Sequence, residues 1–222
     1  MADQEQSGVP GASDQLQQRL ARLYRLVGTA TETDLGKFPP KIFVSDKWFG
    51  IEQDFRGGMN DEQIGDAIYL MLDAIVHLKD HIKNRLAGNS DDAKATKAAV
   101  ESAVKKSEDL RICRILVNQA KHGIPSGCKP SDALALTGFS RVCRMSAGGE
   151  QSQSSVMRQV IRDAVPKMEV TGGGRAEVIL SAEVVDGNGE SLGDIHRIAL
   201  RAVDYWYSLL GDFGLELPDE IG

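Results

Sequence analysis

Long apolar runs are missing from this chain of 222 residues. None approaches the roughly 18 consecutive apolar residues that a membrane-spanning helix needs, so we expect no membrane partner. Residues 1–13 are polar and acidic, without the basic start and apolar middle of a secretory signal, and they predict a flexible tail. With 41% apolar and 26% charged residues, the composition is typical of a soluble protein, and a cytoplasmic location is the expectation.

Cysteine, aromatic and excess basic residues are also scarce. Cys113, Cys128 and Cys143 are widely and evenly spaced, which suits neither a disulfide framework nor a zinc site with close ligand pairs, and we expect them to be reduced. The formal charge of −6 argues against a surface that binds nucleic acid throughout, although local basic patches are compatible with it. Aromatic residues make up 5%, and this, with a weakly apolar Ala/Lys segment at residues 92–106, favours further burial in a homodimer.

Helical periodicity dominates the first half of the chain. Residues 14–27 predict a first helix, and residues 29–58 predict a connecting loop held to the core by aromatic rings. The clearest pattern begins at Asn60, where Gln63 completes the signature of a capping box. The apolar residues that follow at intervals of three and four are Ile64, Ile68, Met71, Ile75, Leu78, Ile82 and Leu86. They predict a helix of more than 20 residues that forms the centre of a helical bundle.

A break in the next helical stretch is expected at Ser107. Residues 92–106 are prone to helix formation but offer few large apolar groups. Ser107 is followed by Glu108 and an aspartate, which is typical of a helix start, and Gly123 is typical of a C-terminal cap. We therefore predict a separate helix that ends at His122.

The residue pattern changes from helical to strand-like after Gly123. Strands are predicted at residues 133–145, 156–165 and 176–185, and the segment 186–189 predicts a turn. Helical spacing returns from Asp194. We therefore predict one α+β domain over residues 14–222, with a helical bundle, a small antiparallel β-sheet and a C-terminal helix. Its predicted parts are 14–122, mainly helical; 123–190, mainly β; and 191–215, the final helix.

One face of the helix that ends at His122 carries a stripe of polar residues. Arg111, Arg114, Asn118 and His122 lie three, four and four residues apart, with Lys121 beside them. Histidine transfers protons near neutral pH and arginine binds phosphate, so the stripe suits cleavage of RNA through its 2′-hydroxyl without a metal or cofactor. In this interpretation His122 is the acid or base, Arg114 holds the phosphate and Asn118 orients the imidazole. Arg111 and Lys121 would bind substrate.

A structural interpretation of the same stripe stays open. Asn118 and His122 would then tie the helix end to the following loop, while the two arginines pair with acids of the long helix. The chain would then be a non-catalytic interaction module.

Two histidines of the long helix offer a third interpretation. His77 and His81 are four residues apart, so both imidazoles point the same way, which is a start for the metal site of a hydrolase. The glutamate that follows the first histidine in metalloprotease helices is absent, and ordinary boundary residues are the alternative. A break at Ser107 is expected to bring Arg111 and Arg114 opposite Asp73, His77, Asp80 and His81. In that arrangement His77, Asp80 and His81 would help to bind substrate.

Two short motifs carry a resemblance to a known group. The step His77-Leu-Lys-Asp80 and the later run Asn118-Gln-Ala-Lys121-His122, followed by a short sheet and a final helix, resemble uncharacterised bacterial and phage proteins with a HEPN-like helical core. The resemblance implies a HEPN-like bundle and a partner such as RNA or a nucleotide-like anion. Many HEPN proteins are dimeric ribonucleases of toxin and antiviral systems that use an arginine and a histidine separated by four to six residues. Here Arg114 and His122 are separated by one residue more.

Overall fold

The computed structural model describes most of the chain. The described residues are 16, 18–20, 22–23, 31–44, 49–88, 93–147, 156–162, 165–171 and 174–215. The predicted tail at residues 1–13 lies outside them. The chain is an α+β protein, as its sequence pattern predicts, with helices, an antiparallel sheet and a final helix. No helix in the described part of the chain has both the length and the apolar character of a membrane span.

The long helix α2 (Asp61–Ala87) begins at the predicted capping box. The backbone N–H of Gln63 donates to Asn60 Oδ1 at 2.8 Å, and the backbone N–H of Asn60 donates to Gln63 Oε1 at 3.0 Å. The predicted apolar stripe is buried from Ile64 to Ile82, with each of its members at most 2% exposed. Burial of that stripe, more than helix propensity, stabilises α2.

A break at Ser107 separates α3 (Ala93–Val104) from α4 (Glu108–His122), which confirms the prediction. Ser107 has an extended backbone, and its Oγ accepts the backbone N–H of Leu110 at 3.2 Å. At the other end of α4, Gly123 has a φ of 75° and its N–H donates to the Gln119 carbonyl. The cap and the terminal glycine fix both ends of α4.

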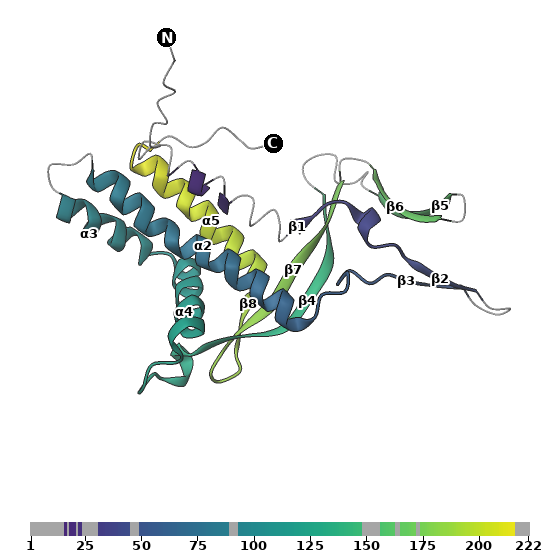
Figure 1. The fold of residues 1–222 in the computed structure, drawn as a ribbon, viewed down its shortest axis with the longest axis horizontal. Helices are drawn as coiled ribbons and strands as arrows, with labels where there is room; N and C mark the ends of the chain where they lie inside the picture. Colours follow the sequence, from purple (N-terminus) through teal and green to yellow (C-terminus); the bar gives the residue numbers. More distant parts are fainter. Residues whose placement is uncertain are drawn as a thin grey trace, which may run out of the picture. The chain divides into compact units, whose positions relative to one another are not determined.

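The last helix, α5 (Ile195–Asp212), packs through an apolar face that includes Trp206. Trp206 is 1% exposed, and its indole N–H donates to the Ile75 carbonyl of α2 at 3.0 Å. Tyr205 donates its hydroxyl to the Ala103 carbonyl of α3 at 2.8 Å. Two aromatic side chains therefore dock α5 on α2 and α3, and Figure 1 shows these helices gathered with α4.

The principal sheet is antiparallel and contains the two longest strands of the described chain. Its strands are β1 (Thr31–Glu32), β4 (Leu134–Ala147), β7 (Gly174–Asp186) and β8 (Ser191–Asp194). β7 pairs with β1, β4 and β8, and its register with β4 runs from Leu134 opposite Asp186 to Ala147 opposite Gly174. The predicted turn after β7 is confirmed, because the carboxylate of Asp186 accepts the backbone N–H groups of Asn188 and Glu190.

Several predicted boundaries are wrong. The sequence predicts a loop at residues 29–58, but β2 (Lys41–Val44) and β3 (Phe49–Glu52) form an antiparallel hairpin there. It predicts that the final helix begins at residue 191, but Ser191–Asp194 form β8 and α5 starts at Ile195. In both cases the segment is a strand because it pairs with another strand, and a short run of residues does not reveal that pairing.

A second hairpin follows β4. The predicted strand at 156–165 corresponds to β5 (Val156–Arg162), and its partner β6 (Val165–Thr171) is a strand that the sequence pattern missed. The described residues also include two short 3₁₀ helices, η1 (Leu35–Lys37) and η2 (Pro130–Asp132).

The chain forms two compact units. The helical unit comprises Met1–Val27, Met71–Ser126 and Ile198–Gly222, and the strand unit comprises Gly28–Leu70 and Gly127–Arg197. α3, α4 and most of α2 and α5 therefore belong to the helical unit. The predicted polar stripe and both predicted histidines of α2 lie within that one unit.

Candidate functional site

A cluster of polar side chains joins the end of α4 to the middle of α2. The ammonium of Lys121 forms an ion pair with the carboxylate of Asp73 and lies 3.1 Å from His77 Nε2. His77 Nε2 is 3.3 Å from Asp73 Oδ1, and His77 Nδ1 is 3.7 Å from Asp80 Oδ2. We call Asp73, His77, Asp80 and Lys121 the α2–α4 cluster.

Helical spacing explains why α2 supplies three members of this cluster. Asp73 precedes His77 by four residues and Asp80 follows it by three, so the three side chains share one face of the helix. That face borders the buried side of α2, where Leu72 and Leu78 are almost completely buried. Lys121 reaches the same face from the last turn of α4. The cluster therefore lies at the edge of a helix–helix contact.

The imidazole of His77 has a charged neighbour at each ring nitrogen. Nε2 lies 3.1 Å from the ammonium of Lys121 and 3.3 Å from Asp73 Oδ1, and Nδ1 lies 3.7 Å from Asp80 Oδ2. A ring that accepts from Lys121 has a lone pair on Nε2, whereas a ring that donates to Asp73 has a proton there. The side chains of His77 and Lys121 are 51% and 45% exposed. Both are accessible to a ligand from solvent.

The predicted arginines have other surroundings. Arg111 pairs with Glu108 of its own helix, with Nε 2.9 Å from Oε2, and the hydrogen bonds from Arg111 lower the pKa of Glu108. Arg114 is half-buried, and its side chain makes no hydrogen bond or ion pair with any residue that the structure describes. The cation of α4 that contacts Asp73 and His77 is that of Lys121. The sequence pattern predicts Arg111 and Arg114 in that position.

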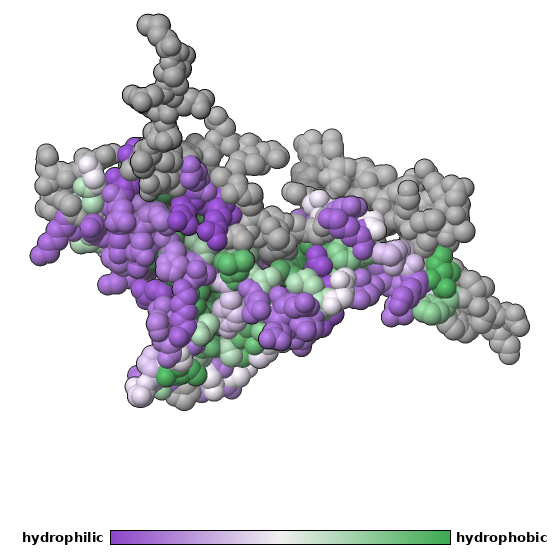
Figure 2. Space-filling model, in the orientation of Figure 1, coloured by the Kyte–Doolittle hydropathy of each residue, from purple (hydrophilic) through white to green (hydrophobic). Residues whose placement is uncertain are grey.

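Asn118 and His122 lie on the exposed side of the last turns of α4. Within the described ranges, neither side chain has a hydrogen-bond or ion-pair partner. Figure 2 shows mostly hydrophilic residues along the visible side of α4. Two groups that can donate and accept protons or hydrogen bonds are therefore open to solvent within one turn of Lys121.

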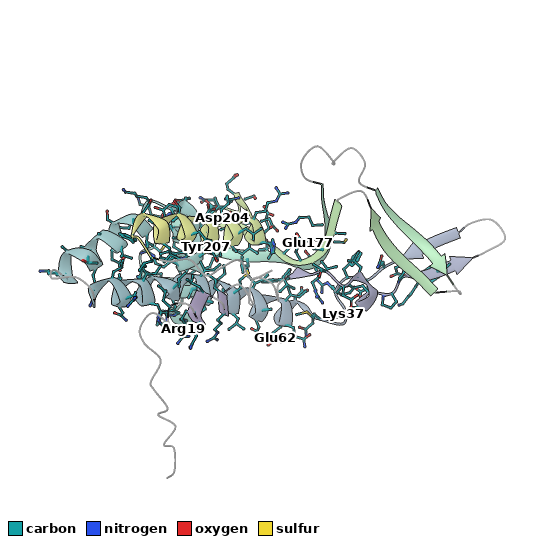
Figure 3. The ribbon with its side chains drawn as sticks, turned by 90° about the horizontal axis from the view of Figure 1, so that it is seen from above. Arg19, Lys37, Glu62, Glu177, Asp204 and Tyr207 are labelled. Atoms are coloured by element: carbon teal, nitrogen blue, oxygen red, sulfur yellow. The ribbon has the colours of Figure 1, made fainter. Side chains whose placement is uncertain are left out.

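His81 differs from His77 in its surroundings. It is partly buried, and this burial lowers its pKa; the positive charge of Arg19 acts in the same direction, whereas Asp80 opposes it. Figure 3 labels Arg19 on a helical segment of the same unit. Among the described residues, no three His, Cys, Asp or Glu side chains are grouped so that they could hold a metal ion. His77 and His81 thus have no third protein ligand in that part of the chain.

A second charged cluster, in the strand unit, was not anticipated from the sequence. Glu177 on β7, which is labelled in Figure 3, is only 7% exposed. It pairs with Arg144, its cross-strand neighbour on β4, with Arg144 Nε 3.0 Å from Glu177 Oε1. His196 is 1% exposed, and burial together with the charge of Arg144 lowers its pKa. The available signal was a glutamate inside the otherwise apolar run from Ala176 to Leu180.

Comparisons with known proteins add no relative. No family model, no curated protein and no solved structure matches the chain. The HEPN resemblance therefore depends on the two short motifs alone. The structure brings one residue of each motif, His77 and Lys121, into direct contact.

Proposed function

We propose that the α2–α4 cluster, together with Asn118 and His122, binds the phosphate groups of RNA or of a nucleotide-like anion. The observation that carries this proposal is the contact between Lys121 and His77, in which a half-exposed ammonium adjoins a half-exposed imidazole. Ammonium and imidazolium groups form charge-assisted hydrogen bonds with phosphate oxygens. Asn118 and His122, both exposed, add further donors beside them.

The same residue types suit cleavage of RNA without a metal. A neutral histidine accepts the proton of the 2′-hydroxyl, the 2′-oxygen forms a bond to phosphorus, and the bond from phosphorus to the 5′-oxygen breaks. A protonated group then supplies a proton to the leaving 5′-oxygen, while a cation stabilises the charge on the phosphate. We propose His122 and His77 for the proton transfers and Lys121 for the charge.

Arg114 lies too far from His122 along α4 for the role that the sequence pattern indicates. Eight positions separate it from His122, which corresponds to about 12 Å along the helix axis. One phosphate is too small for both side chains to hold it firmly across that distance. Arg114 is therefore proposed to contact a neighbouring phosphate, as is Arg111, whose guanidinium already pairs with Glu108.

Binding and cleavage of a labelled oligoribonucleotide in EDTA test this function. We expect Lys121→Met to weaken binding by roughly 10- to 150-fold, because one charge-assisted hydrogen bond to phosphate contributes roughly 1.5–3 kcal/mol. Lys97→Met is the matched control, since Lys97 is an exposed lysine of α3 in the same unit. His122→Ala should abolish cleavage and leave most of the binding. Equal binding by the wild type and the Lys121 variant would contradict the site, and equal cleavage by the His122 variant would contradict the mechanism.

A non-catalytic interaction module is the second candidate, and one observation favours it. Lys121 already has an anionic partner in Asp73, so its contact also fastens the end of α4 to α2. The negative end of the α4 dipole stabilises the ammonium of Lys121 but opposes a bound anion. In this case Lys121→Met would lower the free energy of unfolding by up to about 1 kcal/mol, and RNA would not bind to any variant. A homodimer would fit either function, and analytical ultracentrifugation checks it.

A metal-dependent hydrolase that uses His77 and His81 is the remaining proposal. It requires ligands beyond the described groups. Elemental analysis of the purified protein, with activity measured after addition of zinc or manganese, would test it.

A further inference from the structure

The outer edge of β4 has no strand beside it in the described part of the chain. β7 pairs with β1, β4 and β8, whereas β4 pairs with β7 alone and lies at the end of the strand order. With 14 residues, β4 is the longest of the described strands. The backbone N–H and C=O groups on its outer side therefore form a long template to which another strand can add.

A β-bulge divides this edge into two parts. The register of β4 with β7 shifts between Thr137 and Ser140, and the carbonyl of Phe139 accepts from the guanidinium of Arg56. From Ser140 onward the register is regular. Val142 lies in this regular part and is 40% exposed, whereas its cross-strand neighbour Ile179 is 4% exposed. An apolar side chain is thus exposed on an edge that is open to pairing.

This edge lacks the residues that usually prevent such pairing. Natural edge strands are protected by proline, by lysine and other charges, or by being short. The sequence of β4 contains no proline, lysine, aspartate or glutamate. Its Arg144 pairs with Glu177. Its Arg141 lies 4.9 Å from the centroid of the Phe38 ring and donates to the carbonyl of Arg56. Both positive charges are therefore directed at groups within the chain and protect the edge little.

The other strands at the margin of the principal sheet are short. β1 has two residues and β8 has four, so neither offers many hydrogen bonds to a further strand. Two copies of the chain that pair through β4 would use up the long open edge of each copy. Only short edges would remain outside, so the assembly would close as a two-fold dimer and would not grow into a fibre.

Charge and burial select one register for such a pair. A two-fold axis through the edge makes the two β4 strands antiparallel and sets one residue opposite itself. An axis at Arg141 or Arg144 would bring like charges together, which destabilises a sheet. An axis at Cys143 would set Val142 opposite Arg144. With the axis at Val142, each valine packs on its own copy, Arg141 faces Cys143 and Arg144 faces Ser140, so that both arginines have neutral neighbours.

We propose that the open edge of β4 is the interface of a homodimer, in which Ser140–Arg144 of two copies pair antiparallel about Val142. The principal sheets of the two copies then form one continuous sheet. Backbone hydrogen bonds supply the attraction, and the pair of β-branched valines adds an apolar contact at the centre. An interface of this size is small, so the dimer should be reversible and depend on the protein concentration. This interface does not depend on the proposed function.

Sedimentation velocity at increasing protein concentration tests the interface. The wild type should change from monomer to dimer, and Val142→Lys should remain a monomer where the wild type is a dimer, because two ammonium groups would face each other. Leu192→Lys is the matched control, since Leu192 is 41% exposed on β8 of the same unit, and it should dimerise like the wild type. A wild type that stays monomeric, or a Val142→Lys variant that dimerises equally well, would overturn the proposal.

Cross-linking through an introduced cysteine tests the register. Residues directly opposite each other have Cβ atoms about 4.5–5.5 Å apart, so mild oxidation of Val142→Cys should give a disulfide-linked dimer. Ser140→Cys keeps the same native cysteines, but its two copies would lie about 13 Å apart along the strands and should not cross-link. Equal cross-linking of the two variants, or none in Val142→Cys, would overturn this interface even if the chain dimerises through another surface.

Discussion

Replacement of Ser107 by alanine tests the break that separates α3 from α4. Ser107 is 7% exposed, and its Oγ accepts the N–H of Leu110, a residue that is 2% exposed. Loss of an N-cap costs about 0.5–2 kcal/mol, and water has little access here to replace the lost acceptor. We therefore expect Ser107→Ala to lower the free energy of unfolding by about 1.5 kcal/mol. For a chain of this size that corresponds to a decrease in Tm of roughly 3–6 °C.

Urea and thermal unfolding followed by far-ultraviolet circular dichroism measure this change. Ser102→Ala is the matched control, because Ser102 is exposed inside α3 and alanine favours a helix interior, so this variant should stay within about 0.5 kcal/mol of the wild type. Ser107→Thr, which keeps a capping hydroxyl, should recover most of the loss. If Ser107→Ala were as stable as Ser102→Ala, the hydrogen bond to Leu110 would not be what fixes the start of α4.

Three further outcomes are expected. Trp206→Phe removes a buried indole donor and part of a buried ring, so urea denaturation should show a loss of about 2–3 kcal/mol; a loss below about 0.5 kcal/mol would contradict the docking of α5. Because burial and Arg144 lower the pKa of His196, the unfolded chain takes up the proton first as the pH falls below about 6.5, and stability should decrease there, less steeply in His196→Gln. Burial raises the pKa of Cys113 to about 12, so a thiol reagent should modify Cys128 long before Cys113, and equal rates would be inconsistent with that burial.

Patterns that are local in sequence predicted most of the helical structure. The apolar stripe and capping box of α2, the cap at Ser107 and the glycine after His122 each depend on residues within a few positions of one another. The α+β class followed from the change of periodicity after α4. Predictions of this kind succeed because helices are stabilised by contacts between residues that are three and four positions apart.

Strand pairing and contacts between helices were harder to predict. β2 and β8 are each four residues long, and their partners are identified only by the fold. The polar cluster depends on which side chains of α4 face α2. A shift of one residue along a helix turns the side-chain direction by about 100°, so the choice is sensitive to the packing. The sequence therefore identified His77 and Lys121 as polar candidates, but the pairing of Lys121 with Asp73, in place of an arginine, came from packing.

The small apolar core of α3 has a consequence for local opening. Among its described residues only Val100 and Val104 are buried, and its polar contacts include those of Glu101 with Lys79 and Lys83 and that of the Ala103 carbonyl with the Tyr205 hydroxyl. So little buried apolar surface contributes little to the free energy that keeps a helix in place. Amide hydrogen exchange should therefore be much faster in α3 than in the buried part of α2. α3 would then detach and return many times during one lifetime of the folded helical unit.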